Sequence, residues 1–304
     1  MQDQKLGFIG LGVMGEPMCR NLAAKSRGSS IIAFDLRPEP LARLATDGVA
    51  GARSIAAVAA AADIIFLSLP GEAEIRAVCL GENGRGRGLV NLARDGQAIV
   101  DCSTAPVALA RELAAAFDAR GAHFADAPVA RTRQAAIDGT LSVMVGADDF
   151  LYHRVEPLLR RMATDVTHCG APGAGQAVKL LNNMVLSMTV VALAEALAVA
   201  KASGLVDPKL LFDTLAKGSA DSFALRHHGM KALLPESHPE DAFPVTYMLK
   251  DVSYALELAR SAGLDLQAGQ TARRLLEETQ RLGLGEAYHT AVIEAVRRHR
   301  ADRT

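Results

Sequence analysis

The chain has 304 residues, more than a single core of common size contains, so its length predicts two domains with a ligand site between them. Half of the residues are hydrophobic, 22% are charged and the formal net charge is −1, which excludes a disordered chain and a nucleic-acid partner recruited by charge. The four cysteines are far apart and the eight histidines show no ligand spacing, so we expect free thiols in a reducing compartment and no metal site.

Two stretches bear on the location of the protein in the cell. Residues 1–6 are polar and lead straight into a strand, without the charged segment and apolar core of an export signal, so we expect a cytoplasmic protein. Ala177–Ala200 is mostly apolar, but Lys179, Glu195 and two asparagines interrupt it. We therefore interpret it as a buried helix rather than a membrane span, and expect no membrane partner.

Up to about residue 168, short apolar runs alternate with stretches of helical periodicity. The predicted strands are Leu6–Ile9, Ile31–Asp35, Ile64–Leu69, Ala98–Asp101, His123–Ala127 and Ser142–Val145. The predicted helices between them include Met14–Ala24, Leu41–Thr46 and Val107–Ala119. This alternation is typical of βαβ units and predicts an α/β domain with a mainly parallel sheet.

The second half of the chain has a different pattern. After Thr167 we find no further strand, and the Leu-, Ala- and Glu-rich segments predict helices only. The turn-rich segment Gly170–Gly175 marks the change. We therefore predict a Rossmann-type domain over residues 1–168 and an all-α domain over residues 169–304, opening with an interdomain helix at about residues 173–203.

A glycine-rich segment follows the first predicted strand and opens the first helix. It reads G-x-G-x-x-G, in which the first glycine permits a tight turn, the second lets backbone approach a pyrophosphate and the third lets the helix pack against the strand. Asp35 stands 20 residues after Gly15, at the end of the second predicted strand, where a carboxylate can hold ribose hydroxyls. The predicted cofactor-binding residues here are Asp35 and the loop Gly10, Leu11, Gly12, Val13, Met14 and Gly15.

The charge near this loop bears on the choice of cofactor. Asp35 would repel a 2′-phosphate, which favours NAD over NADP. Arg37 lies two residues further on and could partly reverse that preference, or it could be an ordinary solvated side chain. We expect NAD, with NADP as the alternative.

The predicted interdomain helix carries a lysine and an asparagine on one face. Lys179 and Asn183 are four residues apart, and an isolated helical lysine of this kind is commonly solvated. The flanking residues are apolar, however, and such surroundings lower the pKa of a lysine and allow proton exchange near neutrality. Beside a dinucleotide site, Lys179 is therefore predicted to protonate the developing alkoxide when a carbonyl is reduced, with Asn183 holding the same oxygen or a neighbouring hydroxyl.

A series of motifs along nearly the entire chain resembles one known family. They are Gly7–Met18, Leu69–Pro70, Asp101–Thr104, Asp126–Val129, Gly139–Leu141, the lysine helix and Lys250–Asp251. In this order they resemble the β-hydroxyacid dehydrogenases, which include 3-hydroxyisobutyrate dehydrogenase and tartronate semialdehyde reductase.

The resemblance implies roles for particular residues. Lys179 would be the general acid or base and Asn183 would assist substrate binding. Thr104 and the Leu69–Pro70 turn would line the nicotinamide side. Lys250 matches a C-terminal motif whose lysine reaches into the closed site near the cofactor, although a solvated salt bridge with the next residue is the alternative. The family likeness also implies that the all-α domain over residues 169–304 serves in substrate binding and oligomerisation, and that the protein forms a homodimer or homotetramer.

One departure from the family pattern concerns the substrate. Most members continue Asp-Ala-Pro-Val with Ser-Gly-Gly, where the serine and the following amides grip a carboxylate, whereas this chain has Ala130–Thr132. Arg131 offers a permanently charged bidentate clamp that suits a strongly acidic anion such as a sulfonate, and the Arg-Thr pair resembles the sulfolactaldehyde reductase branch. Alternatively, Arg131 points to solvent or bridges subunits. The predicted substrate-binding residues are Ser103, Thr104, Arg131, Thr132 and Asn183.

The sequence therefore predicts an NAD(P)-dependent oxidoreductase. Its reaction would interconvert a small 3-hydroxy acid, or a hydroxy-sulfonate, and the corresponding semialdehyde, with Lys179 as general acid and base. An imine reductase on the same architecture and a non-catalytic NAD-binding module are the alternatives, and the lysine disfavours both.

Overall fold

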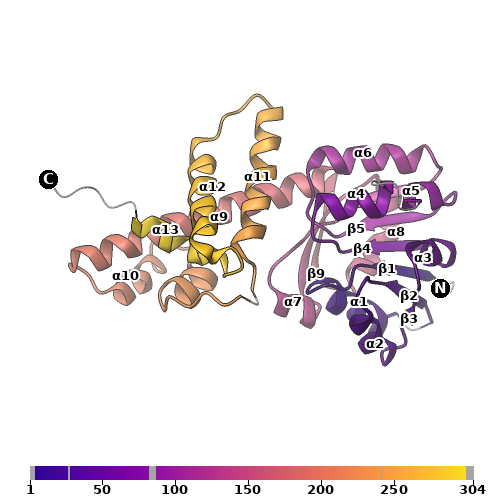
Figure 1. Cartoon of the computed structure of the whole chain (residues 1–304), viewed down its shortest axis with the longest axis horizontal. Coiled ribbons are helices and arrows are strands. Elements are labelled where there is room, and N and C mark those ends of the chain that lie inside the picture. Colours follow the sequence, from indigo (N-terminus) through magenta and orange to yellow (C-terminus); the bar gives the residue numbers. More distant parts are fainter. Residues whose placement is uncertain (1–3, 27, 82–86, 241, 299–304) are drawn as a thin grey trace. The chain divides into compact units, whose positions relative to one another are not determined.

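The computed structural model describes residues 4–26, 28–81, 87–240 and 242–298 (Figure 1). The chain divides into two compact units, residues 1–179 and residues 180–304.

The first unit contains a sheet of nine strands among the described residues, in the order β3-β2-β1-β4-β5-β6-β8-β7 with β9 paired to β8. The strands are β1 (Lys5–Ile9), β2 (Ser30–Phe34), β3 (Ala50–Gly51), β4 (Ile64–Leu67), β5 (Ala98–Asp101), β6 (His123–Asp126), β7 (Val129–Ala130), β8 (Leu141–Gly146) and β9 (Ala163–Gly170). The first six are parallel, β8 runs antiparallel to β6 and β7, and β9 is parallel to β8. The chain reverses its direction of travel across the sheet between β1 and β4, which is where open α/β sheets bind ligands.

Helices accompany both faces of this sheet. They are α1 (Gly15–Ala24), α2 (Pro38–Ala45), α3 (Ile55–Ala61), α4 (Glu72–Leu80), α5 (Leu89–Leu92), α6 (Val107–Asp118), α7 (Arg133–Asp138) and α8 (Asp149–Leu159). Alternate strand residues enter two different cores, because Phe8 and Phe66 belong to one apolar cluster while Ile9 and Ile65 belong to another. Burial on both faces explains why these strands appear in the sequence as continuous apolar runs.

The expected α/β architecture is confirmed, with some differences in detail. All six predicted strands are present, but β3, β7 and β9 were not predicted. β3 and β7 contain only two residues each, too few for a hydrophobic period, and β9 is mostly polar, with only Ala163 and Val166 buried and no regular alternation. β9 also extends to Gly170, so strand structure continues slightly beyond the point at which we expected helices only.

Helices are the main elements of the second unit among its described residues, with one isolated antiparallel bridge between Pro244 and Tyr288. Its elements are the larger part of α9 (Ala174–Ser203), α10 (Pro208–Leu215), the π-helix η1 (Leu225–Leu233), α11 (Val245–Ser261), α12 (Gln267–Thr279), η2 (Gln280–Leu284), the 3₁₀ helix η3 (His289–Val292) and α13 (Ile293–Arg298). They enclose a single apolar cluster around Leu197, Phe212 and Val252. The units meet within α9, so its first turns belong to the α/β unit, whereas we expected the boundary at residues 168–169.

By length and composition alone, α9 could cross a membrane, with a mean hydropathy of 1.8 over its most apolar window. Half of that window is buried inside the protein. Val190, Leu193 and Leu197 contribute to the core of the second unit. Packing in a protein core therefore accounts for the apolar character of α9.

Candidate active site

Each glycine of the loop after β1 meets the spatial demand predicted for it. Gly10 has φ +90°, and a Cβ there would collide with the Ser68 carbonyl oxygen. A Cβ on Gly15 would collide with the Gly10 carbonyl oxygen, so the start of α1 rests directly on the loop backbone. Around Gly12 nothing lies within 4 Å of the Cβ position, which leaves the backbone there open to a ligand.

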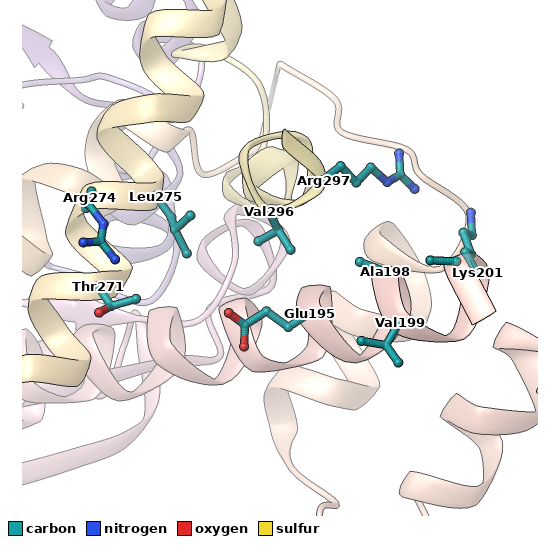
Figure 2. A pocket seen from close by; sticks show the side chains of 10 residues that line it. Glu195, Ala198, Val199, Lys201, Thr271, Arg274, Leu275, Val296 and Arg297 are labelled. Atoms are coloured by element: carbon teal, nitrogen blue, oxygen red, sulfur yellow. The ribbon is translucent and has the colours of Figure 1, made fainter. Parts of the chain in front are cut away.

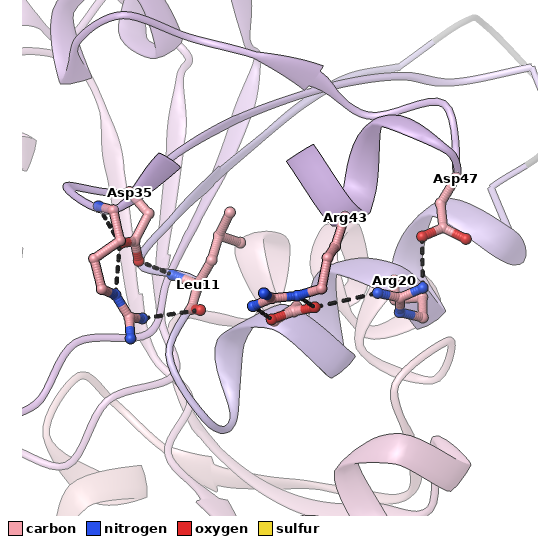
Figure 3. Close-up of polar contacts among 7 residues, drawn as sticks. Leu11, Arg20, Asp35, Arg43 and Asp47 are labelled. Carbon is pink, nitrogen blue, oxygen red and sulfur yellow. Dashed lines mark hydrogen bonds and ion pairs between the residues drawn. The ribbon is translucent and has the colours of Figure 1, made fainter. Parts of the chain in front are cut away.

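Asp35 is bound to this loop rather than projecting freely into solvent (Figure 3). One carboxylate oxygen accepts a hydrogen bond from Leu11 N at 2.6 Å, and the other accepts from Arg37 N at 2.8 Å. Partial burial raises the pKa of Asp35, but these backbone donors and the Arg37 guanidinium outweigh it, so the pKa lies below its usual value. Asp35 is therefore ionised at neutral pH.

A chain of ion pairs at the first turn of α1 was not predicted from the sequence (Figure 3). Glu16 accepts two hydrogen bonds from Arg43, at 2.8 and 2.7 Å, and one from Arg20 at 3.2 Å. Arg20 also pairs with Asp47 at 2.8 Å. The Arg43 hydrogen bond is the main cause of a lowered pKa for Glu16. These pairs tie α1 to the α2 segment and neutralise the carboxylate beside the helix N-terminus.

The turns that follow β4 and β5 are joined by Ser103. Its hydroxyl accepts a hydrogen bond from Leu69 N at 2.8 Å, and Ser103 N donates to the Asp101 carboxylate at 3.0 Å. Ser103 is buried, whereas Thr104 is half-buried at the same edge of the sheet. The Ser103 hydroxyl therefore holds the two turns together, and its contact with substrate stays a prediction.

Asp126 and Gln176 surround the start of α9, and sequence reasoning assigned neither a role. The Asp126 carboxylate accepts hydrogen bonds from Gly173 N at 2.6 Å and Gln176 N at 2.7 Å. Burial raises the pKa of Asp126 to about 6. The Asp126–Val129 motif and the glycine-rich entry to the helix were visible in the sequence, but spacing alone did not reveal that they meet.

Lys179 lies in α9 and is only 8% exposed. Among its neighbours along the helix, Leu180 is fully buried, whereas Val178 and Val185 are 43% and 55% exposed. Asn183 follows one turn later on the same helix and is also buried.

In the second unit, Asp251 links two of the predicted site residues. Its carboxylate accepts a hydrogen bond from Asn183 Nδ2 at 2.6 Å, and Lys250 Nζ lies 3.3 Å from its other oxygen. Lys250 Nζ also lies 5.6 Å from the ring centre of Tyr247 and 5.5 Å from that of Tyr254. Asp251 thus orients the Asn183 amide, a role that we had not assigned to it.

The structure gives Arg131 a different partner from the substrate anion that we expected. Its guanidinium donates to Asp165 at 2.5 Å, to Thr164 Oγ1 at 2.8 Å and to the Thr140 carbonyl oxygen at 2.5 Å, all within the α/β unit. These three contacts hold the guanidinium against β9 and the start of β8, and a role of Arg131 as a substrate clamp stays a prediction. Thr132 is likewise engaged, because its hydroxyl accepts from Ala135 N and caps α7.

A cavity of about 820 Å³ lies elsewhere in the second unit, beside α9, α12 and α13 (Figure 2). Two of its cations, Lys201 and Arg297, are paired with Glu236. None of the predicted site residues lines it; the lining residues are Glu195, Ala198, Val199, Lys201, Ala202, Thr271, Arg274, Leu275, Val296 and Arg297. Nor does any group of three potential metal ligands occur among the described residues.

The structure has the features of an NAD(P)-binding oxidoreductase of two domains. A glycine loop lies where the parallel sheet reverses its direction of travel, an ionised aspartate is held against that loop, and the second unit consists mainly of helices. Comparison with known families agrees. Residues 5–170 match the NAD-binding domain of 6-phosphogluconate dehydrogenase, and residues 173–296 match the NAD-binding domain of NADP-dependent 3-hydroxyisobutyrate dehydrogenase.

Individual relatives extend over nearly the complete chain. The 2-(hydroxymethyl)glutarate dehydrogenase of Eubacterium barkeri is 33% identical, covering 95% of this chain and 94% of its own. The 2-hydroxy-3-oxopropionate reductase of Escherichia coli is 32% identical, covering 96% and 97%. A solved structure of Mycobacterium tuberculosis 3-hydroxyisobutyrate dehydrogenase with L-serine has a TM-score of 0.86 and 31% identity, covering 97% and 99%.

The chain belongs to the 3-hydroxyisobutyrate dehydrogenase family of NAD(P)-dependent hydroxyacid dehydrogenases. It is therefore an oxidoreductase, and the resemblance recognised from its motifs is confirmed. The named relatives act on different hydroxy acids, so the family defines the type of reaction and not the substrate.

Proposed function

We propose that the protein interconverts a small 3-hydroxy acid and its semialdehyde, with Lys179 as the general acid and base. The observation that carries this proposal is a buried lysine one helical turn from a buried, oriented asparagine, on a helix whose start is held against the turns that follow the sheet. The bound nicotinamide supplies or accepts the hydride.

The residues of the chain provide the proton and the orientation. In the reducing direction, Lys179 Nζ donates a proton to the carbonyl oxygen as the alkoxide develops, and in the oxidising direction it takes the hydroxyl proton back. Asn183 donates one amide hydrogen to Asp251, which fixes the amide plane and leaves the other hydrogen for the substrate. Lys250, paired with the same carboxylate, adds positive charge for an anionic substrate or cofactor.

The acid end of the substrate needs a partner other than Arg131 in its present arrangement. We assign this role to the Ser103–Thr104 turn and to Thr132, because Thr104 is half-buried at the sheet edge and a hydroxyl can donate while it accepts another bond. A carboxylic semialdehyde fits such neutral donors. A sulfonate would favour a cationic clamp, which requires Arg131 to leave Asp165.

We further propose NAD as the preferred cofactor, a cytoplasmic location and assembly into a homodimer or homotetramer. Asp35 supports the first, since an ionised carboxylate at that position repels a 2′-phosphate. Exposed apolar side chains in the second unit, including Val199 on α9 and Leu210 on α10, support the last. A comparison of initial rates with NADH and NADPH tests the cofactor preference, and sedimentation analysis tests the oligomeric state.

The deciding experiment follows NADH consumption with tartronate semialdehyde, methylmalonate semialdehyde, succinate semialdehyde and 3-sulfolactaldehyde. We expect turnover of tartronate semialdehyde or methylmalonate semialdehyde, whose reduction gives a 3-hydroxy acid, and loss of that turnover with retained NADH binding in Lys179→Met. Turnover of succinate semialdehyde alone would contradict the proposal, because its product is a 4-hydroxy acid. Preference for the sulfonate would restore Arg131 as the specificity element. If the protein reduced none of the four aldehydes but reduced cyclic imines, the result would favour an imine reductase. If it reduced neither the aldehydes nor the imines and still bound NADH, the result would favour a non-catalytic module.

A further inference from the structure

The start of α9 is attached to the sheet by a carboxylate that is fully buried. Asp126 is the last residue of β6, and its two oxygens accept hydrogen bonds from Gly173 N and Gln176 N, at 2.6 and 2.7 Å. The first amides of a helix have no partner within the helix, and their dipoles favour a negative charge. Asp126 therefore fixes the point at which α9 begins and the orientation of its first turn.

The side chain of Gln176 continues this attachment to the turn after β5. It is fully buried, its Oε1 accepts from Ala105 N at 3.0 Å and its Nε2 donates to the Ser103 carbonyl oxygen at 2.8 Å. These two partners flank Thr104, so one amide holds the backbone on both sides of that residue. The Ser103 hydroxyl then accepts from Leu69 N, which extends the connection to the Leu69–Pro70 turn.

Two glycines make room for this arrangement. A Cβ on Gly175 would collide with the Met144 carbonyl oxygen and lie 2.9 Å from the Asp126 carboxylate. A Cβ on Gly146 would press against the same carboxylate, with its carbon at 2.9 Å. The requirement at both positions is space, so α9 can approach β6 and β8 this closely only without side chains there.

We propose that Gln176, held by Asp126, is a positioning residue that sets Lys179 relative to Thr104 and the Leu69–Pro70 turn. Gln176 and Lys179 are three residues apart on one helix, so a shift or rotation at Gln176 is carried to the lysine. The inference rests on the proposed function, because it assigns Lys179 and Thr104 to the same reaction. Gln176 itself is not a catalytic residue.

Turnover of Gln176→Met tests the proposal, because methionine fills the same space and makes neither hydrogen bond. We expect kcat to fall about 100-fold while the KM for NADH changes by less than about twofold, as for a displaced catalytic group. The matched control is Gln267→Met, which removes an exposed glutamine at the start of α12 that donates a hydrogen bond to Asp265. An unchanged kcat in a folded Gln176→Met protein would overturn the proposal.

Gln176→Glu adds a readout that general loosening of the structure would not produce. A protonated carboxyl can accept from Ala105 N and donate to the Ser103 carbonyl oxygen as glutamine does, whereas an ionised one repels that oxygen. We expect the ratio of variant to wild-type kcat to rise as the pH is lowered from about 8 to about 6, because burial beside Asp126 favours the protonated form. A ratio that stays flat or falls would overturn the proposal.

A third measurement does not depend on turnover. In protein labelled with ¹³C at lysine Cε, the Lys179 signal is assigned by its loss in Lys179→Arg. We expect Gln176→Met to change its chemical shift and its titration midpoint, and Gln267→Met to leave both unchanged. If the wild-type protein reduces none of the aldehydes, the proposed function fails, while an unchanged Lys179 signal in Gln176→Met would separately overturn the positioning role.

Discussion

Arg131 adopts a left-handed backbone conformation with φ 85°, which is unusual for a residue with a side chain. The family pattern has glycine at this position, and glycine adopts that conformation without strain. The ion pair with Asp165 and the bonds to Thr164 and Thr140 accompany the arginine that replaces it. The unusual residue that suggested a substrate clamp is thus explained, in this structure, by contacts that brace β8 and β9.

Replacement of Arg131 separates these effects. Arg131→Ala keeps the strain of the left-handed backbone and removes a half-exposed ion pair, so we expect a small loss of unfolding free energy. In Arg131→Gly the relief of strain offsets that loss, so its stability in urea should exceed that of Arg131→Ala. The KM for the semialdehyde should stay near the wild-type value in both, and a large rise would show that Arg131 leaves Asp165 to bind substrate.

At the scale of elements, α9 and α11 are joined in the second unit by buried polar groups. Asn183 on α9 donates to Asp251 on α11, and Asp251 is only 1% exposed. A buried amide that loses its acceptor keeps the cost of its desolvation. The pair therefore holds a predicted substrate residue in place and also contributes to the packing of the two helices.

Removal of the acceptor should be costly. We expect Asp251→Ala to lower the unfolding free energy by about 1–3 kcal/mol, because Asn183 keeps no partner at that position. Asp251→Asn, whose amide oxygen can still accept, should lose less. The control is Asp213→Ala, which breaks the exposed pair with Lys209 and should leave stability almost unchanged. Equal losses in all three variants, measured by urea unfolding, would contradict this assignment.

At the scale of the whole molecule, the two units contain buried titratable groups of opposite character. In the first, burial raises the pKa of Asp126 to about 6. In the second, burial lowers the pKa of His228 to about 4 and that of His289 well below its usual value, with repulsion from neighbouring histidines adding to both. His228 bonds Tyr288 at 2.5 Å, and its ring centre lies 5.0 Å from that of His289.

These shifts predict opposite responses to acid in the two units. A carboxyl group whose pKa is higher in the folded state stabilises that state fully below the pKa of the unfolded chain, and this contribution is lost as the pH rises through about 6. The first unit therefore gains stability from Asp126 as the pH falls. A histidine whose pKa is lower in the folded state stabilises that state above the pKa of the unfolded chain. For His228 this contribution is lost as the pH falls from 6.5 to about 4. For His228 alone the loss is about 3 kcal/mol in the second unit.

Amide hydrogen exchange, measured at pH 7 and pH 5 and corrected for intrinsic exchange rates, reports the pH dependence of stability separately for each unit. We expect protection to decrease in α11 and η1 of the second unit and to be maintained or increased at the start of α9. His228→Phe should reduce the pH dependence of the second unit only. A uniform decrease in both units would show that neither buried group controls the response.

Much of the architecture could be predicted from local pattern. The strands β1, β2, β4, β5, β6 and β8 and the long α9 were expected, because apolar periodicity is set by which face of an element is buried. The two-residue strands β3 and β7 carry no such period, and the polar β9 is recognised only through its pairing with β8. Short or half-exposed strands are defined by partners that lie elsewhere in the chain.

The site divides in the same way. By itself, the sequence determined the glycine loop with Asp35, the lysine and asparagine one turn apart, and the family, since each depends on spacing within one segment. Only the tertiary structure decided that Arg131 pairs with Asp165, that Asp251 holds Asn183, and that Asp126 and Gln176 attach α9 to the turns beside β5. Hydrogen bonds between residues far apart in the chain depend on how the elements pack, and spacing along one segment carries no record of that packing.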